Sequence, residues 1–303
     1  MRRKINLVGT STLTISLPAK TAKKFKLKKG DEVEIKEQGN TIVIELGKLK
    51  RDEVGRIYFK RSEEFLKRYL INLYNQGYDA IEITSDEPLN FREIKRALAE
   101  LLGFEIVDQT EKSCVIKRIA SPEEDEFNAV LLRIFHVVHL MAQNGLEALI
   151  KRNHNLLRET IDLDVLASKF INFCIRVLYQ QKPVNSLYLY YILSEVEQIS
   201  DDWKRICQVA LISKEIKCSS QTAKFYESII EHFRKVFNAF YKFKREEMSL
   251  LKQSRLNLFN DGESLLAKTK GQESLFIHYL LEVLNRIHHI ETNISYCVSS
   301  AEL

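Results

Sequence analysis

The sequence predicts a multidomain chain: a small β domain at the N-terminus, a small α+β domain in the middle and an all-α bundle beyond it. Three observations support this prediction. A chain of 303 residues is longer than one ordinary domain. Its first part alternates polar and apolar side chains, as strands do. After Pro122 the only further proline is Pro183, and glycine occurs only at Gly145, Gly262 and Gly271, which is typical of long helices.

Composition and charge narrow the class of protein. With 45% hydrophobic and 29% charged residues, the chain reads as globular rather than disordered. Residues 1–50 hold twelve Lys and Arg against five Asp and Glu, within a total net charge of +5. The rest of the chain is therefore slightly acidic. The positive charge therefore belongs to one end of the chain.

The cysteines and the apolar runs argue against a disulfide-stabilised protein, a zinc-thiolate protein and a membrane-spanning protein. The five cysteines are scattered and never form a CxxC pair, so we expect free, buried thiols rather than disulfides or a thiolate zinc site. The most apolar stretch, residues 129–142, carries Arg133, His136 and His139, and no membrane-spanning run is expected. The two histidines share one helix face among apolar neighbours, which indicates core or interface histidines. The N-terminus resembles no signal peptide, so we expect a cytoplasmic protein.

The N-terminal segment reads as a short series of strands. Residues 4–17 alternate and predict one half-buried strand, which Pro18 ends. A short basic helix follows, and then a turn at residues 29–31. The next sixteen residues predict two strands that form a hairpin around Gln38-Gly39-Asn40.

This order, with the phrases STLTISLP and LKKGDEVEI, resembles the SpoVT/AbrB family of swapped-hairpin DNA-binding domains. The resemblance covers about 45 residues. It implies that two chains interleave into one barrel, and so short a β segment indeed has too few residues to bury a core alone. We therefore expect residues 1–48 to bind DNA and to form a homodimer.

The resemblance also implies which residues contact DNA. Basic side chains before the first strand and on the short helix would contact phosphates, with an affinity that depends on salt. On the strand where bacterial members usually present arginines, this chain has threonines, which argues against direct reading of bases there. A solvated helix face is the alternative reading of the lysines. The expected DNA-binding residues are Arg2, Arg3, Lys4, Thr12, Thr14, Lys20, Lys23 and Lys24.

Residues 55–119 predict a separate α+β domain. Strand-like segments enclose two helical ones, and Asn90 is placed to cap the second helix. The helix-like segment 62–77 carries an apolar stripe expected in the core: Phe65, Leu66, Tyr69, Leu70 and Leu73. The domain has no glycine-rich phosphate loop. Its arrangement resembles the segment between the AbrB-like and helical parts of archaeal PhoU-like regulators, which implies that it spaces or couples its neighbours.

From residue 122 the pattern predicts six long helices in two sets of three. The expected helices are 123–152, 154–180, 186–213, 219–245, 247–268 and 272–297. Residues 126–135 match 224–233, and residues 196–206 match 284–294. In both matches apolar residues align with apolar residues. The matches predict a tandem duplication within residues 122–299, with repeats 122–214 and 219–299.

The phrase VEQISDD places Val196, Glu197, Ile199 and Asp201 as in the hallmark of PhoU-type phosphate-signalling proteins, which it resembles. The order of the three parts is similar to archaeal PhoU-like phosphate uptake regulators with an N-terminal AbrB-like domain. The resemblance implies a DNA-binding transcriptional regulator of phosphate homeostasis whose bundle senses a signal or docks a partner. The alternative is an adaptor that contacts a phosphate transporter or sensor kinase and reads no DNA sequence.

The same resemblance implies carboxylate-rich metal sites on the bundle, because such cations prefer oxygen ligands. Asp164, Glu197 and Asp201 match the first site, although Thr160 replaces an expected acidic residue. At the second site only His289 is left as a transition-metal ligand. The alternative is a solvated acidic surface without a metal. No cofactor is required in either case.

An enzyme is not expected. A di-iron carboxylate bundle requires Glu-x-x-His pairs, and no histidine in this sequence has a glutamate three residues before it. No serine or cysteine stands in a nucleophile motif. The expected partners are DNA, a second copy of the chain, and a transporter or signalling protein.

Overall fold

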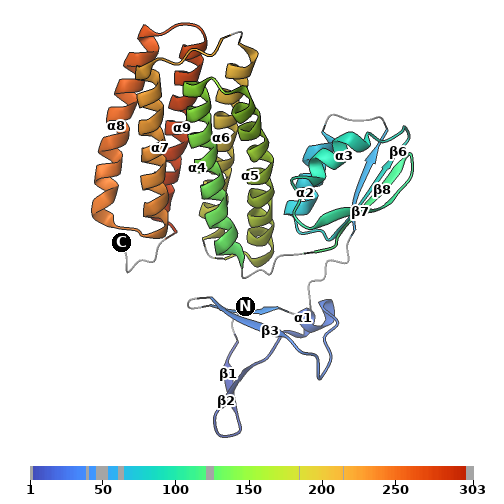
Figure 1. The fold of residues 1–303 in the computed structure, drawn as a ribbon. Coiled ribbons are helices and arrows are strands. Elements are labelled where there is room, and N and C mark those ends of the chain that lie inside the picture. Colours follow the sequence, from blue (N-terminus) through green and yellow to red (C-terminus); the bar gives the residue numbers. More distant parts are fainter. Residues whose placement is uncertain are drawn as a thin grey trace. The chain divides into compact units, whose positions relative to one another are not determined.

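The computed structural model describes residues 3–38, 41–45, 54–60, 65–120, 126–183, 185–213 and 215–297. The chain divides into two compact units, Met1–Arg51 and Asp52–Leu303. A small β region at the N-terminus precedes a mostly helical C-terminal region (Figure 1), which confirms the coarse prediction of fold class.

The first unit consists of two hairpins and a short helix. Strands β1 (Ile5–Val8) and β2 (Thr12–Ile15) pair antiparallel, as do β3 (Glu34–Gln38) and β4 (Thr41–Glu45), and helix α1 (Ala19–Lys24) lies between them in sequence. The prediction of one strand over residues 4–17 was wrong, because the chain turns at Gly9. Its φ of 70° lies in the region that favours glycine. The turn residues 39–40 of the other predicted hairpin lie outside the described residues.

The second unit begins with an α+β domain. Its elements are β5 (Gly55–Phe59), α2 (Leu66–Asn75), β6 (Ala80–Ser85), α3 (Phe91–Leu98), β7 (Phe104–Gln109) and β8 (Ser113–Arg118). They form one sheet of order β5-β6-β8-β7, in which β5 and β6 are parallel and the other neighbours antiparallel. The Asn90 side chain accepts a hydrogen bond from the Glu93 amide at 3.3 Å and caps α3 as expected.

The buried stripe of α2 is narrower than predicted. Leu66, Leu70 and Tyr74 are buried at a spacing of one turn. Phe65 and Tyr69, expected in the core, are exposed because they lie beside this stripe.

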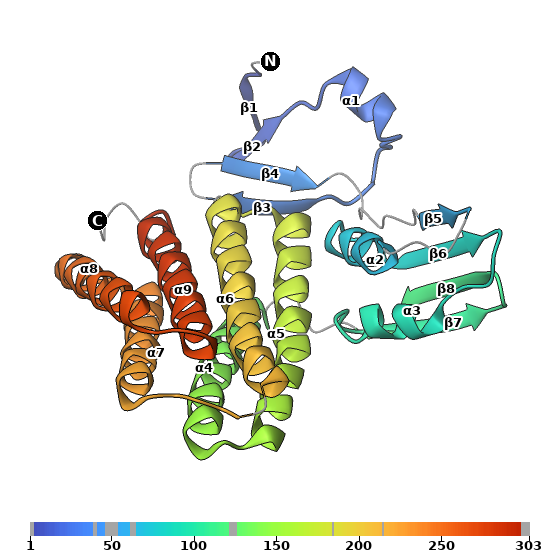
Figure 2. The same ribbon diagram turned by 90° about the horizontal axis from the view of Figure 1, so that it is seen from above.

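Beyond this domain, the described part of the second unit consists mainly of six long helices (Figure 1). They are α4 (Phe127–Lys151), α5 (His154–Gln181), α6 (Ser186–Ile212), α7 (Ser220–Tyr241), α8 (Arg245–Lys268) and α9 (Gln272–Ile294). Helices α4, α5 and α6 pack together, as do α7, α8 and α9. The two groups meet where α6 packs on α9 and α4 on α7. Figure 2 shows the same helices from above, the first group green to gold and the second orange to red.

The bundle has one continuous apolar core with Trp203 at its centre. Trp203 is fully buried, and its ring lies 5.0 Å from the Tyr226 ring between centroids. Cys174 and Cys207 are buried free thiols, as expected, whereas Cys218 and Cys297 are only partly buried. Large apolar side chains from both groups therefore fill a shared interior.

Arg176 of α5 joins the bundle to the α+β domain. Its guanidinium donates hydrogen bonds to the backbone carbonyls of Tyr74 at 2.6 Å, Gly77 at 3.2 Å and Tyr78 at 2.9 Å. It also donates to Asp79 Oδ1 at 2.5 Å. These carbonyls lie in the last turn of α2 and in the segment just after it, and the Tyr74 carbonyl also accepts from the Gly77 amide at 2.9 Å.

Helix α4 is the most apolar helix of the bundle. Within the described residues it alone is long and apolar enough to pass a membrane-span test, with a mean hydropathy of 1.2 over its best window. The expectation that no run reaches such a length was therefore wrong for this helix. The test is weak evidence of a span, since core helices pass it too, and 44% of the window is buried inside the protein.

Candidate nucleic-acid interface and charged sites of the bundle

The basic residues of the first unit form an exposed surface. Arg3, Lys4, Lys20, Lys23 and Lys24 are all exposed, and Arg2 lies outside the described residues. None of these five forms an ion pair with another described residue, although Lys24 Nζ lies 5.3 Å from the centre of the Phe25 ring. Helix α1 has no acidic residue in its first turn. Its lysines are thus available to bind phosphates.

The hairpin of β1 and β2 gathers polar side chains, together with Val8, on one face. Asn6 pairs with Thr14 and Val8 with Thr12, and the Thr14 hydroxyl donates to the Asn6 carbonyl at 3.3 Å. Because side chains alternate along a strand, Leu7 and Leu13, which also pair, lie on the opposite face. The expected DNA-contacting threonines therefore share one exposed face.

The apolar face of this unit is not covered within one chain. No described residue of the first unit belongs to a buried core. Burying one such side chain stabilises by about 1.5–3 kcal/mol, so this face favours association. The exposed apolar side chains are Ile5, Leu7, Val8, Leu13, Ile15, Leu17, Phe25, Val33, Ile35, Ile42 and Ile44.

In the bundle, Lys204 lies between two of the expected metal ligands. Its ammonium donates to Asp164 Oδ2 at 2.6 Å and also to Asp201 Oδ1. The Ser200 hydroxyl donates to Asp164 Oδ1 at 2.8 Å. The structure thus brings Asp164 and Asp201 together, as expected, but around a lysine. This ammonium supplies the positive charge that a cation would otherwise provide.

Glu197 lies beside this cluster and makes no ion pair with a described residue. Burial raises the pKa of its carboxyl, and the charges of Asp201, Glu100 and Asp164 raise it further. Glu100 comes from the α+β domain, where Lys67 Nζ lies 2.6 Å from its carboxylate. Burial raises the pKa of Glu100 as well. The acidic cluster therefore reaches the junction of the two domains.

His289 is engaged by a carboxylate of the facing helix. Its Nδ1 lies 3.1 Å from Glu195 Oε1, and Arg286 Nη1 lies 3.6 Å from the other oxygen of Glu195. Among the described residues, no group of three or more His, Cys, Asp or Glu side chains is arranged to hold a metal. A metal at Asp164, Glu197 and Asp201, or at His289, stays a prediction, which the residues around it do not favour.

A buried ionic triad in the second group of helices was not predicted. Glu291 of α9 accepts from Arg255 Nε at 2.9 Å, and its other oxygen lies 2.8 Å from His232 Nε2. All three side chains are buried. A signal was present in the sequence: in the internal matches, Glu291 aligns with Trp203 and His232 with Ile134. Charged residues at positions that are apolar in the matching segment indicate a buried pair.

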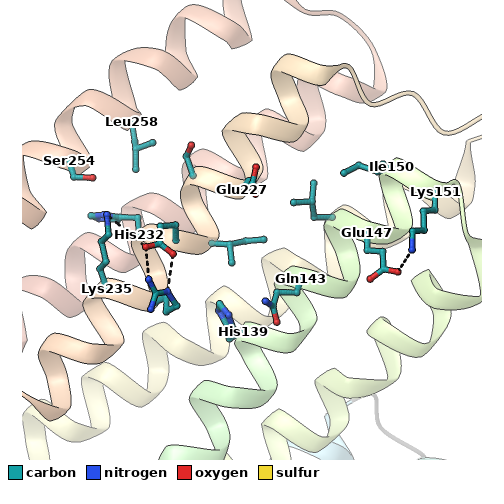
Figure 3. Close-up of a pocket in the computed structure, with 15 residues that line it drawn as sticks. His139, Gln143, Glu147, Ile150, Lys151, Glu227, His232, Lys235, Ser254 and Leu258 are labelled. Carbon is teal, nitrogen blue, oxygen red and sulfur yellow. Dashed lines mark hydrogen bonds and ion pairs between the residues drawn. The ribbon is translucent and has the colours of Figure 1, made fainter.

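A groove of about 880 Å³ lies against α4, α7 and α8. Figure 3 shows its lining, with His139, Gln143 and Glu147 from α4 and Glu227, His232 and Lys235 from α7. His139 is partly buried, and burial lowers its pKa, which favours the neutral imidazole. His136, expected in a core or interface, is exposed, with its ring 5.8 Å from that of Phe237.

Lys204 and Arg176 were missed in the sequence for different reasons. Lys204 stands three residues after Asp201, a spacing that allows an ion pair on one helix, so a local signal existed. Arg176 contacts residues about one hundred positions earlier in the chain, and no local pattern marks such a contact.

Comparison with known proteins bears on the first unit. Residues 7–52 match the family described as "Antidote-toxin recognition MazE, bacterial antitoxin". No curated protein matches the chain. The N-terminal segment is therefore similar to MazE/AbrB-like domains, as the exposed hairpins and basic helix suggested.

Proposed function

We propose that this protein is a DNA-binding transcriptional regulator that acts as a homodimer. The observation that carries the proposal is the first unit itself, which combines a MazE-like segment, apolar hairpin faces without a core and lysines without ion pairs. Two chains that interleave these hairpins would bury the apolar faces and place two basic surfaces on one dimer. Such a pair suits a DNA site with two half-sites.

The helical bundle would supply the signal. Its resemblance to PhoU-type proteins supports a role in phosphate uptake, with the bundle sensing phosphate status or docking a transporter or signalling protein. Because each first unit is tied to a bundle, a change in how two bundles pair would reorient the basic surfaces and alter DNA affinity.

The test is a fluorescence-anisotropy titration of the full chain with its own upstream DNA and with a scrambled duplex. We expect tighter binding to the upstream duplex, and an affinity that falls steeply between about 50 and 200 mM salt. Equal or absent binding would contradict the regulator. The adaptor, in which residues 1–48 only dimerise and the bundle contacts its partner, would then be favoured.

The description of the matched family favours a second candidate, an antitoxin-type regulator that binds a toxin protein. Expression of the chain together with a toxin encoded beside it tests this candidate. Relief of growth arrest by the full chain would support it, and arrest that persists would exclude it for that toxin.

A further inference from the structure

A groove runs along the face formed by α4 and α7. The groove follows α4 from His139 to Lys151, about 18 Å at ~1.5 Å per residue. Its lining mixes polar side chains with apolar ones such as Leu146 and Leu258. Figure 3 shows side chains of α4 and α7 around the groove, with Ser254 and Leu258 of α8 beside them.

Helix α4 also exposes an apolar stripe. Leu132, Leu140 and Ile150 are 38%, 43% and 59% exposed. Helices α5, α6 and α7 pack on the other sides of α4. An apolar stripe along a helix that is otherwise covered by the core is typical of an interaction surface.

The charges beside the groove indicate its occupant. Three acidic and three basic side chains line it: Glu147, Glu227, Glu231, Lys151, Arg234 and Lys235. Three ion pairs form among them, Glu147–Lys151 at 2.7 Å, Glu231–Arg234 at 2.6 Å and Glu231–Lys235 at 3.9 Å. A surface with balanced charges has little attraction for DNA or an anionic membrane. It suits a two-fold contact, in which acidic residues of one copy meet basic residues of the other.

We propose that the α4–α7 face pairs with the same face of a second copy of this chain. The inference rests on the proposed function, because dimerisation through the first unit holds a second bundle nearby. Strand β4 ends at Glu45 and β5 begins at Gly55, so the connection between the units is short. A short tether raises the effective concentration of the second bundle to the millimolar range, where even a weak contact forms.

Cysteine cross-linking of the full chain tests the pairing. Gln143 is exposed and lines the groove, and Glu159 of α5 is exposed elsewhere. Gln143→Cys and the matched control Glu159→Cys are made in a chain that carries Cys218→Ser and Cys297→Ser. Each variant is treated with a short bis-maleimide. We expect Gln143→Cys to cross-link between chains at least several-fold faster than the control.

A second variant separates the pairing from the dimer itself. Adding Leu140→Glu should reduce the cross-linking of Gln143→Cys to the control level, while sedimentation still shows a dimer held by the first unit. If the protein is a dimer but the two cysteine variants cross-link at the same rate, the pairing is overturned and the proposed function stays intact. The same conclusion follows if Leu140→Glu does not change the cross-linking of Gln143→Cys. A monomer in sedimentation overturns the proposed dimer and the pairing together.

Discussion

At the level of single residues, buried charge holds the second unit together. Arg176 satisfies three carbonyls at the end of α2 and lies over the ring of Tyr74 at 4.9 Å. Lys204, which is partly buried, neutralises two aspartates within the bundle. Such groups are costly to bury alone, so each depends on all of its partners.

Replacing Arg176 should weaken the junction strongly. Arg176→Met leaves the carbonyls of Tyr74, Gly77 and Tyr78 without this donor, and we expect a loss of about 3–5 kcal/mol in the free energy of unfolding. Urea unfolding measures this loss. The exposed Arg158 provides the control, since Arg158→Met should change stability by less than about 0.5 kcal/mol. Equal effects of the two substitutions would show that Arg176 contributes little to the junction.

Gly103 is a second residue on which the α+β domain depends. Its φ is 78°, and a Cβ there would lie 1.8 Å from the Ala120 carbonyl oxygen. Gly271 has a φ of 67° but open space around its Cβ position. We expect Gly271→Ala to cost about 1 kcal/mol and Gly103→Ala at least about 3 kcal/mol. Thermal unfolding compares the two, and similar losses would mean that the loop at Ala120 moves freely.

Glu197 should make stability depend on pH. Burial raises its folded-state pKa above the unfolded value of about 4.3, so the folded chain holds the proton more tightly. Its contribution is therefore present at low pH and is lost as pH rises through the folded-state pKa. We expect Glu197→Gln to raise the free energy of unfolding at pH 7 and to flatten this pH dependence in urea titrations.

The same variant tests the predicted metal. If a metal ion binds Glu197, Glu197→Gln lowers the stability at pH 7, and a chelator destabilises the wild-type chain. A rise in the free energy of unfolding of Glu197→Gln at pH 7 therefore indicates a carboxylate without a metal, and a fall indicates a metal ligand.

At the level of elements, α1 is the segment that should carry DNA affinity. Its helix is short and has no buried residue, so its lysines contribute little to folding. The hairpins on either side have little stability alone, because isolated two-stranded hairpins are marginal in water. The role of these elements is therefore best tested in the full chain.

Neutralising α1 should change the salt dependence of DNA binding. With Lys20, Lys23 and Lys24 all changed to Gln, we expect the slope of log K against log salt to fall by up to about 2.7. Anisotropy titrations over a salt series measure the slope. The matched control changes three exposed lysines of the bundle, Lys252, Lys268 and Lys270, and should leave the slope unchanged. Equal slopes in both variants would contradict a DNA contact through α1.

At the level of the whole molecule, the proposed dimer would cover the exposed apolar side chains of the first unit. We expect the two faces of the β1–β2 hairpin to serve different functions, one in dimerisation and the other in DNA binding. Leu13 lies on the apolar face and pairs with Leu7, whereas Thr12 lies on the polar face. Under the proposed function, dimerisation would depend on the face of Leu13, and DNA contact on the face of Thr12.

Opposite substitutions on this hairpin test the separation. Leu13→Asp places a charge in the buried dimer contact, and we expect a monomer in sedimentation at micromolar concentration. Thr12→Asp should leave the dimer intact but weaken DNA binding at least several-fold, because its charge repels phosphates. A dimer that survives Leu13→Asp would show that the hairpin face is not the contact.

Much of the architecture followed from the sequence. The predicted and observed helices of the bundle agree within a few residues, because helical periodicity persists over many turns. The turn at Gly9 was missed because the alternation of residues 4–17 continues through it, so one strand and a hairpin predict the same pattern. Exposure of Phe65 and Tyr69 could not be read locally, since it depends on what packs against α2.

The sequence by itself determined the order of the parts, their helices and most strands, and the basic N-terminal end, because these follow from local periodicity and charge. The proximity of Asp164 to Asp201 was expected from the resemblance to PhoU-type proteins. Only the tertiary structure decided that Lys204 occupies the space between these aspartates, that Arg176 joins two domains, and that Glu291 is buried with His232 and Arg255. Apart from the Lys204–Asp201 pair on α6, those contacts join residues far apart in the chain, and which charges meet depends on how the helices pack.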